Sequence, residues 1–240
     1  MLWSSNKVIR LALIVLMLCT YVKLNAQKVD LFASVGYGSY SHHEMKDYQS
    51  YLVNSSGLSA TVTNAFPPYY TFLFGLNVQL PKWTLGLEAG HGSTGGRVYY
   101  EDYSGKLIQD QFITYNYVGL TPSFFMINSN GLCLTGGIKL LLVNHSLSIK
   151  NSLTVGSQTI YENQDFSGIN LGIQPNILFR KYFDRVFLQA SAGYELQSKS
   201  YLETKDEPKL FLDNGSGNPV HLQGNGYRLS LGAGIVFGSD

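Results

Sequence analysis

The feature of this sequence that most constrains its fold is an alternation of apolar and polar residues with a period of two. Between Phe166 and Arg180, every second residue from Ile169 to Phe179 is apolar, and the residues between them are mostly Gly, Asn and Gln. Successive side chains of a β-strand point to opposite sides, so this pattern predicts a strand with one apolar and one polar face. The pattern occurs eight times, in Val29–Tyr40, Tyr69–Leu80, Trp83–Gly92, Gln111–Ile127, Leu132–Val143, Phe166–Arg180, Arg185–Gln197 and Gly226–Phe237.

The connections between these predicted strands differ systematically in length. Tight reversals near Pro81, Asn130 and Phe183 alternate with four long polar segments, 41–68, 93–110, 144–165 and 198–223. Long and short connections therefore lie at opposite ends of the predicted sheet. Outer-membrane barrels have this asymmetry, with an even number of strands, short periplasmic turns and longer external loops.

The apolar face distinguishes a membrane barrel from a soluble β-protein. It carries about five or six apolar residues per strand with almost no charge. In a soluble sandwich or a lipocalin-like barrel, the competing interpretation, this surface would have to pack inside, and it is too large for a small soluble core. Lipid cannot satisfy exposed peptide groups, so strands cross a bilayer only as a closed ring, which eight strands can form. We therefore predict an all-β fold, an eight-stranded antiparallel up-and-down transmembrane β-barrel.

The first 26 residues differ from the rest of the chain. Lys7 and Arg10 precede the apolar run 11–20, and a plausible cleavage site ends at Ala26, before Gln27. This arrangement is typical of a secretory signal peptide, and a run of roughly ten apolar residues is short of the ~20 that a transmembrane helix needs. We predict a cleavable signal peptide at 1–26 and a single outer-membrane β-barrel domain at 27–240.

Cysteine and charge content exclude two further classes of protein. Cleavage would leave Cys133 as the one thiol of the mature chain, which excludes a disulfide-stabilised scaffold. Three of the 17 basic residues lie in the signal peptide, so 14 would remain against 16 acidic residues, a net charge of −2. This balance lacks the basic footprint of a nucleic-acid-binding protein.

Several features of the chain resemble the small outer-membrane β-barrel families related to the OmpA/OmpX and PorT-like groups. They are the Ala26-Gln27 signal junction, the strand that begins at Val29, Pro122 in the fourth predicted strand and the Gly-rich final strand 232–237. Together with the alternation, this resemblance spans nearly the whole mature chain. The chain departs from the pattern in continuing through 238–240 after the aromatic residue of its last strand, which displaces the usual C-terminal insertase signal. The resemblance implies an outer-membrane location, and no cell-wall anchoring of the kind known in longer OmpA-like proteins.

The polar faces of the predicted strands place a polar network in the lumen, made of Asp30, Glu88, Lys139, Gln174, Arg180, Glu195 and Arg228. Counting from the short turns, we expect Glu88 and Lys139 to meet near mid-height, together with Gln174. Glu195 and Arg228 lie on adjacent strands toward the outer half of the barrel.

Asp30 and Arg180 are predicted to lie toward the periplasmic end of the same lumen. Charges paired inside a narrow lumen stabilise it only when their hydrogen bonds are complete. The network could be an ion path or gate, or it could plug the barrel. Because eight-stranded interiors are generally filled by side chains, we favour the plug, and a large solute pore is not expected.

Aromatic residues at the strand ends are predicted to form two interfacial girdles, and a role in carbohydrate binding is the alternative. The girdles comprise Trp83, Phe124, Phe179, Tyr182 and Phe237 at one end, and Tyr37, Tyr70, Tyr115, Tyr194 and Tyr227 at the other.

Two short motifs could carry chemistry. His91-Gly92-Ser93 resembles the His-x-Ser of lipid A deacylase-like barrels and could supply a base and a nucleophile, but no acid can be assigned to orient His91. The run 42–44, His-His-Glu, could bind a metal ion in a loop. Adjacent histidines of this kind are more often polar surface, and no ligand spacing supports a metal site.

We expect a non-enzymatic integral protein of the cell outer membrane with periplasmic termini, whose long external loops serve envelope integrity, adhesion or partner binding. The alternatives are a narrow porin-like channel and a lipid A deacylase-like enzyme. Expected partners are outer-membrane lipid and lipopolysaccharide, the barrel-assembly machinery during insertion, and an external ligand that the alternation does not specify. No cofactor, metal or nucleic acid is expected.

Overall fold

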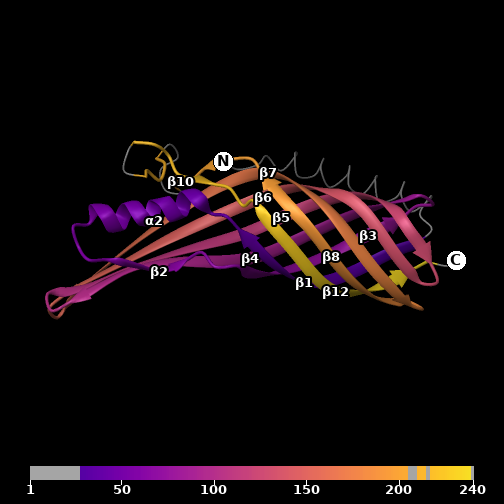
Figure 1. Ribbon diagram of the computed structural model, residues 1–240, viewed down its shortest axis with the longest axis horizontal. Helices are drawn as coiled ribbons and strands as arrows, with labels where there is room; N and C mark the ends of the chain where they lie inside the picture. The colour runs from indigo at the N-terminus through magenta and orange to yellow at the C-terminus, as the bar shows by residue number, and fades with distance from the viewer. Residues whose placement is uncertain (1–27, 205–209, 215–216, 239–240) are drawn as a thin grey trace, which may run out of the picture.

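Eight antiparallel strands close into a barrel in the computed structural model, which describes residues 28–204, 210–214 and 217–238 (Figure 1). The ring strands are β1 (Lys28–Tyr40), β3 (Tyr69–Gln79), β4 (Trp83–Asp102), β5 (Gly105–Ser129), β6 (Leu132–Val155), β7 (Gln158–Phe183), β8 (Val186–Gln197) and β12 (Gly226–Phe237). Consecutive ring strands pair with each other, and β12 pairs with β1 to close the ring. The predicted eight-stranded up-and-down barrel is confirmed. The predicted signal peptide at 1–26 lies outside the described residues.

Three tight turns join strands at one end of the ring, near Pro81, Asn130 and Phe183, as predicted. In the turn between β5 and β6, Asn130 and Gly131 have φ values of 53° and 69°. Two consecutive residues with positive φ characterise the two-residue hairpin turn whose twist matches that of the strands, and Asn-Gly is its preferred sequence. The Asn-Gly pair therefore fixes the register of this hairpin.

The wall of the barrel is apolar outside and polar inside. Leu231 and Leu171 on the outside are 71% and 67% exposed, whereas Glu88, Lys139 and Arg180 are buried inside the ring. A soluble barrel has the opposite distribution. An exterior of this kind is stable in contact with lipid, so the ring is a transmembrane barrel.

A row of polar residues marks the level at which the wall leaves the lipid. His91, Asn116 and Asn144 are outward-facing residues that lie side by side on β4, β5 and β6. The next outward row toward the short turns is apolar and includes Val118 and Leu142. Outward-facing residues change from apolar to polar where a barrel wall passes from the bilayer core into water, so the polar row lies at the membrane surface.

Two of the predicted long loops, 93–110 and 144–165, are strands in the structure. β4 and β5 continue to pair as far as Asp102↔Gly105, and β6 and β7 continue as far as Val155↔Gln158. The prediction was wrong because the outward residues of these extensions are largely polar, so the apolar outer face that marks a lipid-facing strand is lost. We call the projecting sheet, residues 93–102, 105–114, 146–155 and 158–167, the external blade (Figure 1).

The predicted long loop 41–68 also folds, which corrects the prediction of an irregular segment. It contains α2 (His43–Ser55) and β2 (Thr61–Ala65), and β2 pairs with β4 at the margin of the blade. Met45, Tyr48 and Gln49 of α2 are buried, because residues three and four apart share one face of a helix. Within the described residues, no helix combines the length and the apolar character that a membrane crossing requires.

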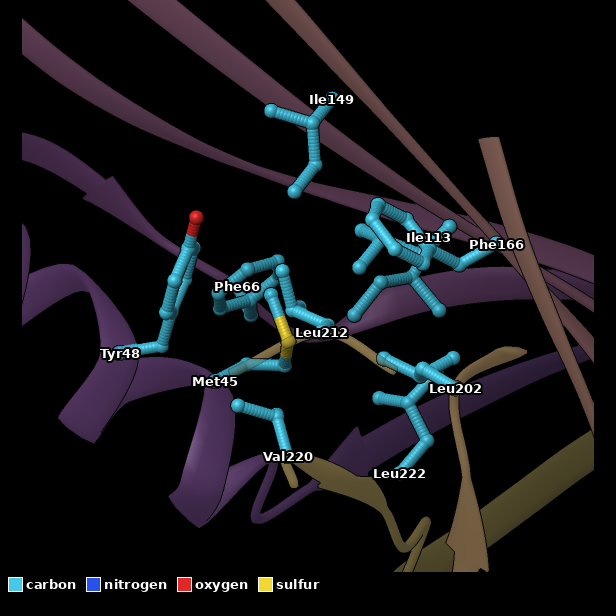
Figure 2. Close-up of a cluster of buried hydrophobic side chains, with 11 residues drawn as sticks. Met45, Tyr48, Phe66, Ile113, Ile149, Phe166, Leu202, Leu212, Val220 and Leu222 are labelled. Carbon is cyan, nitrogen blue, oxygen red and sulfur yellow. The ribbon is translucent and has the colours of Figure 1, made fainter. Parts of the chain in front are cut away.

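The predicted loop 198–223 contributes three two-residue strands, β9 (Ser200–Tyr201), β10 (Glu203–Thr204) and β11 (His221–Leu222). Together with α2 and the blade it encloses an apolar core (Figure 2). Its buried members are Met45, Tyr48, Phe66, Ile113, Leu147, Ile149, Phe166, Leu202, Leu212, Val220 and Leu222. We call the blade, residues 41–66 and the described residues of 198–222 the external module.

Candidate functional site in the barrel lumen

Asp30 and Arg180 form a buried ion pair at the end of the lumen that has the short turns. Arg180 Nη1 in β7 lies 2.7 Å from Asp30 Oδ2 in β1. Gln79 Nε2 donates to both oxygens of Asp30, at 2.8 and 2.9 Å, and Arg180 Nε donates to Gln189 at 3.1 Å. The guanidinium also lies over the ring of Phe187, 4.9 Å from its centroid. These contacts close this level of the lumen.

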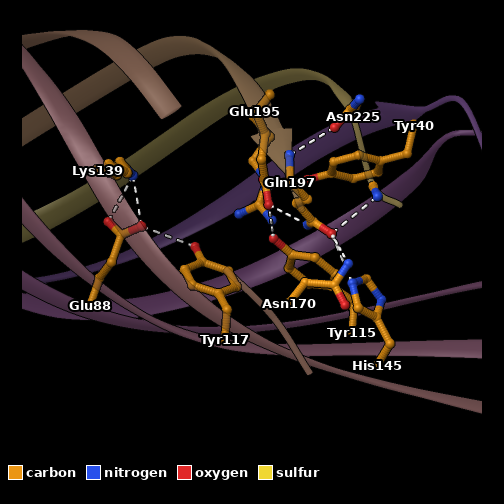
Figure 3. Close-up of polar contacts among 12 residues, drawn as sticks. Tyr40, Glu88, Tyr115, Tyr117, Lys139, His145, Asn170, Glu195, Gln197 and Asn225 are labelled. Carbon is orange, nitrogen blue, oxygen red and sulfur yellow. Dashed lines mark hydrogen bonds and ion pairs between the residues drawn. The ribbon is translucent and has the colours of Figure 1, made fainter. Parts of the chain in front are cut away.

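Glu88 and Lys139 form a second ion pair at mid-height (Figure 3). Lys139 Nζ lies 2.7 and 2.8 Å from the two oxygens of Glu88, which also accepts a hydrogen bond from Tyr117 at 3.1 Å. Glu88 is in β4 and Lys139 is in β6. Gly119 of the intervening strand β5 lies opposite Glu88, and a Cβ there would lie 3.4 Å from Glu88 Cγ. The missing side chain leaves the space in which the two charged residues meet.

Gln174 lies beside this pair, but its side-chain oxygen forms no hydrogen bond with either residue. It lies opposite Lys139 in the pairing of β6 with β7 and is buried. Its Oε1 atom has no hydrogen-bond partner. The structure thus brings Gln174 to the predicted level of the lumen without linking that oxygen into the network.

Glu195 and Arg228 form the centre of a third level, toward the external module. Arg228 Nε lies 2.6 Å from Glu195 Oε2. Glu195 also accepts hydrogen bonds from Tyr115 at 2.5 Å, Gln197 at 2.5 Å and Tyr40 at 3.2 Å (Figure 3). Arg228 also contacts the Tyr40 hydroxyl and lies over the ring of Tyr115, with its Cζ atom 4.6 Å from the centroid. The carboxylate and the guanidinium are therefore both enclosed by tyrosine rings.

The sequence interpretation missed the tyrosines of this third level. Tyr115 was assigned to an interfacial girdle, but it is 1% exposed and points into the lumen. The signal was present, because Tyr115, Tyr117 and Gly119 occupy alternate positions of one strand and therefore share a face. Tyr182, assigned to the other girdle, is half-buried and accepts a hydrogen bond from Gln79 at 3.0 Å.

Little space remains in the lumen between the lower and the middle level. A cavity of about 30 Å³ lies there, lined in part by Asn77, Ser123 and Asn176. A cavity of this size has room for no more than a few water molecules. The three levels of paired charges and the side chains between them therefore fill the barrel.

The His-His-Glu run is not simply polar surface, which corrects that interpretation for two of its members. His42 is 2% exposed, and neither ring nitrogen has a hydrogen-bond partner. Burial lowers the pKa of His42 to about 3. His43 is exposed. Within the part of the chain that the structure describes, no group of three or more His, Cys, Asp or Glu side chains is arranged to hold a metal ion.

Glu44 instead ties α2 to the last long connection. Its Oε2 atom accepts hydrogen bonds from the backbone N–H of His221 at 2.7 Å and from Nδ1 of the same residue at 2.8 Å. Its Oε1 atom lies 3.0 Å from Lys199 Nζ. Partial burial acts to raise the pKa of Glu44, but these hydrogen bonds outweigh it, so the pKa lies below its usual value.

His91 and Ser93 lie at the polar rim of the wall and face outward. His91 Nδ1 is hydrogen-bonded to Asn116 Oδ1 at 2.8 Å, and Asn116 is the residue opposite it on β5. The amide of Asn116 therefore orients the His91 ring, whereas in a catalytic triad a carboxylate would accept the hydrogen bond from Nδ1 of the histidine. The geometry therefore gives no support for a catalytic role of His91 and Ser93 beyond the resemblance of the His-Gly-Ser sequence to the His-x-Ser motif.

No protein-family model matches the chain, and no curated protein matches it. The outer membrane protein OprG from Pseudomonas aeruginosa has a similar structure, with a TM-score of 0.48 and 8% identity over 90% of this chain and 98% of that one. A major outer membrane protein from Thermus thermophilus gives 0.46 and 13% over 87% and 99%. Neisserial surface protein A gives 0.38 and 12% over 88% and 96%.

These solved structures are outer-membrane proteins, the group that the sequence resembles. At such identities and TM-scores the likeness carries no argument about activity. The barrel itself rests on the strand pairing and on the apolar wall of this chain. Its function has to be inferred from the lumen and from the external module.

Proposed function

We propose that this protein is a non-enzymatic integral protein of the outer membrane, with a closed lumen and an external module that binds a macromolecular partner. The observation that carries the proposal is that the kind of side chain inside the barrel changes along the barrel axis. At bilayer level the interior is filled by paired charges and by side chains packed around them, such as Leu141 and Tyr117, and above it lies an apolar core that supports the blade. A molecule built in this way has no path for solutes and has a rigid surface outside the membrane.

The two ends of the ring support the orientation in the membrane that we propose. The start of β1 and the end of β12 meet at the end with the short turns, where Val29 pairs with Phe237. Outer-membrane barrels keep short turns on the periplasmic side. In this proposal both ends of the barrel lie in the periplasm, the assembly machinery inserts it from there, and lipopolysaccharide surrounds the outer part of the wall.

The tip of the blade supports binding to a partner. Tyr103 lies at the turn between β4 and β5, and Leu153, Val155, Ile160 and Tyr161 lie on the neighbouring hairpin, all of them exposed. Soluble surfaces rarely gather apolar side chains in this way unless another molecule covers them. Strand pairing holds these residues in place, so a partner would meet a surface that is already ordered.

Conductance measurements test the closed lumen. In planar bilayers the wild-type barrel should give no discrete current steps. The variant Asp30→Ala/Glu88→Ala/Lys139→Ala/Arg180→Ala/Glu195→Ala/Arg228→Ala, which removes both partners of the ion pair at all three levels, is the control for the sensitivity of the recording, because it should admit water and ions. Steps from the wild-type protein that change when Lys139 alone is replaced would overturn the proposal in favour of a narrow channel.

A trimmed barrel tests the external module. Residues 99–108 and 152–161 are each replaced by Asn-Gly, so that Val98 opposite Gln109 and Asn151 opposite Glu162, which have the same pairing parity as the native turn ends, close two-residue turns in the existing register. Bacteria that make the full protein should attach to a film of serum proteins more strongly than bacteria without it. The trimmed variant should fold, as a heat-dependent gel shift would show, and should lose this gain. Equal attachment by both forms contradicts the proposal.

A further inference from the structure

One margin of the external blade is a long strand with a neighbour on only one side in the described part of the chain. Residues 158–165 of β7 pair with β6 in an unbroken register. On the other side of β7, β10 reaches only Phe166 and Ser167, and β8 pairs from Gly172 onward. All eight residues of 158–165 are exposed. Their backbone N–H and C=O groups on that side are available to a further strand.

The opposite margin of the blade is protected, and this one is not. β2 covers β4 there, and β2 is only five residues long, with a register irregularity between Val62 and Asn64. Short strands, bulges, Lys and Pro are the devices by which proteins prevent pairing at an edge. Residues 158–165 read Gln-Thr-Ile-Tyr-Glu-Asn-Gln-Asp and contain no Pro, no Lys and no bulge. Among the described residues, none covers this edge, which therefore has the features of one open to strand addition.

The side chains of the edge indicate the chemistry of its partner. Ile160 and Tyr161 are 66% and 75% exposed and point to opposite faces of the sheet. Glu162 and Asp165 form no ion pair with a described residue, although other carboxylates of the blade do, such as Asp110 with Arg97 at 2.5 Å. Glu162 accepts only a neutral amide hydrogen bond, from Gln164 at 3.0 Å. Within the part of the chain that the structure describes, the edge thus carries two negative charges without an ion-pair partner, beside two exposed apolar side chains.

We propose that residues 158–165 bind an extended, Lys- or Arg-rich segment of another protein, which adds to β7 as a further strand. The backbone supplies the hydrogen bonds, Glu162 and Asp165 select basic residues, and Ile160 and Tyr161 take apolar side chains on the two faces. A second copy of this chain fits less well, because pairing along this edge would place four carboxylates together. The inference rests on the proposed function and names the site and the partner class for it.

The test uses the full barrel in lipid nanodiscs and a synthetic peptide in which Lys alternates with Val and Thr, with a matched peptide that has Glu in place of Lys. The Lys peptide should slow hydrogen exchange of the amides of 158–165. Glu162→Lys should weaken its binding by roughly two- to fivefold, the range for one exposed charge pair. Glu162→Lys/Asp165→Lys should bind the Glu peptide better than the Lys peptide. Asp47→Lys, the same charge change on the exposed side of α2, should leave binding unchanged.

Four results would overturn the inference. Equal binding of the two peptides would refute the basic partner, and protection confined to other amides would refute the site. Protection of 158–165 that grows with protein concentration and needs no peptide would identify a second copy as the occupant. If neither peptide protects the edge and the trimmed barrel still loses attachment, the inference fails while the proposed function stands. If the trimmed barrel keeps its attachment, the proposed function fails as well.

Discussion

Removal of one partner from the mid-lumen ion pair should strongly destabilise the barrel. Lys139 supplies two of the contacts of the Glu88 carboxylate, at 2.7 and 2.8 Å, and Tyr117 supplies the third, at 3.1 Å. Both charged residues are buried, with 7% exposure for Lys139 and 6% for Glu88. The substitution Lys139→Met therefore leaves a carboxylate with one hydrogen bond in a lumen that holds little water.

Removal of one partner of a buried ion pair lowers the free energy of unfolding by about 3–5 kcal/mol, because the other charge stays buried without compensation. Glu88→Gln should have an effect of similar size, since it leaves the ammonium group of Lys139 unpaired. The double variant Glu88→Gln/Lys139→Met buries no charge and should lie within about 1–2 kcal/mol of the wild type, since neutral replacements of buried pairs are often tolerated. The three variants form a double-mutant cycle in which the pair shows a large coupling energy.

The cycle can be measured by urea unfolding of the barrel in lipid vesicles. Trp83 is the one tryptophan of residues 27–240 and lies on the outer wall, so its fluorescence reports the loss of lipid contact. If each single variant changes the unfolding free energy by less than about 1 kcal/mol, as for a pair in water, then water enters the lumen and the reasoning is refuted. The closed-lumen proposal would be refuted by the same result.

Three further predictions concern the external module and the wall. Because the pKa of His42 is about 3 in the folded protein and about 6.5 when unfolded, the unfolded state binds the extra proton between these values. The stability contributed by neutral His42 is complete above pH ~6.5 and is lost as the pH falls toward 3; hydrogen exchange of α2 should accelerate over this range. His42→Phe should weaken that dependence, and the part that remains should come from protonation of Glu44. Glu44→Gln should loosen α2 by about 1 kcal/mol or less, measured as faster exchange or proteolysis of α2 in the folded barrel, because the carboxylate is partly exposed. Gly137→Ala should lower the unfolding free energy by about 1–3 kcal/mol, since its Cβ would lie 2.6 Å from the backbone oxygen of Pro122; an unchanged urea midpoint would show that the strands can separate there.

The strands within the bilayer could be predicted because lipid imposes a strict pattern. A residue that faces lipid has to be apolar, and its neighbours along the strand face the lumen, so the period of two is present in every spanning strand. The same pattern assigned Glu88, Lys139 and Arg180 to the lumen, where the structure places them. The tight turns were marked separately by residues such as Asn130 and Gly131, which adopt positive φ readily.

The external module could not be predicted in the same way because water lies on its outer side. Ser148 and Lys150 face outward on β6, while Leu147 and Ile149 face the core, so the alternation continues but its outward residues resemble those of a polar loop. α2 has a narrow buried face, since His43–Ser55 contains three buried residues. Its place over the blade depends on contacts between distant segments, such as Glu44 with His221, which no local pattern specifies.

The partners in the lumen follow from the register of the whole ring. Glu195 and Arg228 are on paired strands, but they meet diagonally, because Arg228 lies opposite Gly193. Asp30 and Arg180 are on β1 and β7, which are separated by two strands of the ring and meet across the lumen. Alternation decides which face a residue occupies, whereas the tilt and stagger of a closed barrel decide which inward residues meet at one height.

The inward-facing side chains of β6 show why the lumen and the external module are filled by different kinds of residue. Along one face of this strand, Lys139 at bilayer level is followed by Leu141 and Val143, which pack in the lumen. Leu147 and Ile149 come next on the same face and lie in the core of the module. Above the membrane, burial of apolar side chains removes them from water and stabilises the module in the ordinary way. Within the bilayer the lipid already covers the apolar wall, so the interior is free to hold polar groups, provided that they are paired. Paired charges can therefore be held in the lumen among packed side chains, whereas the apolar core stabilises the blade in water, where the proposed partner would meet it.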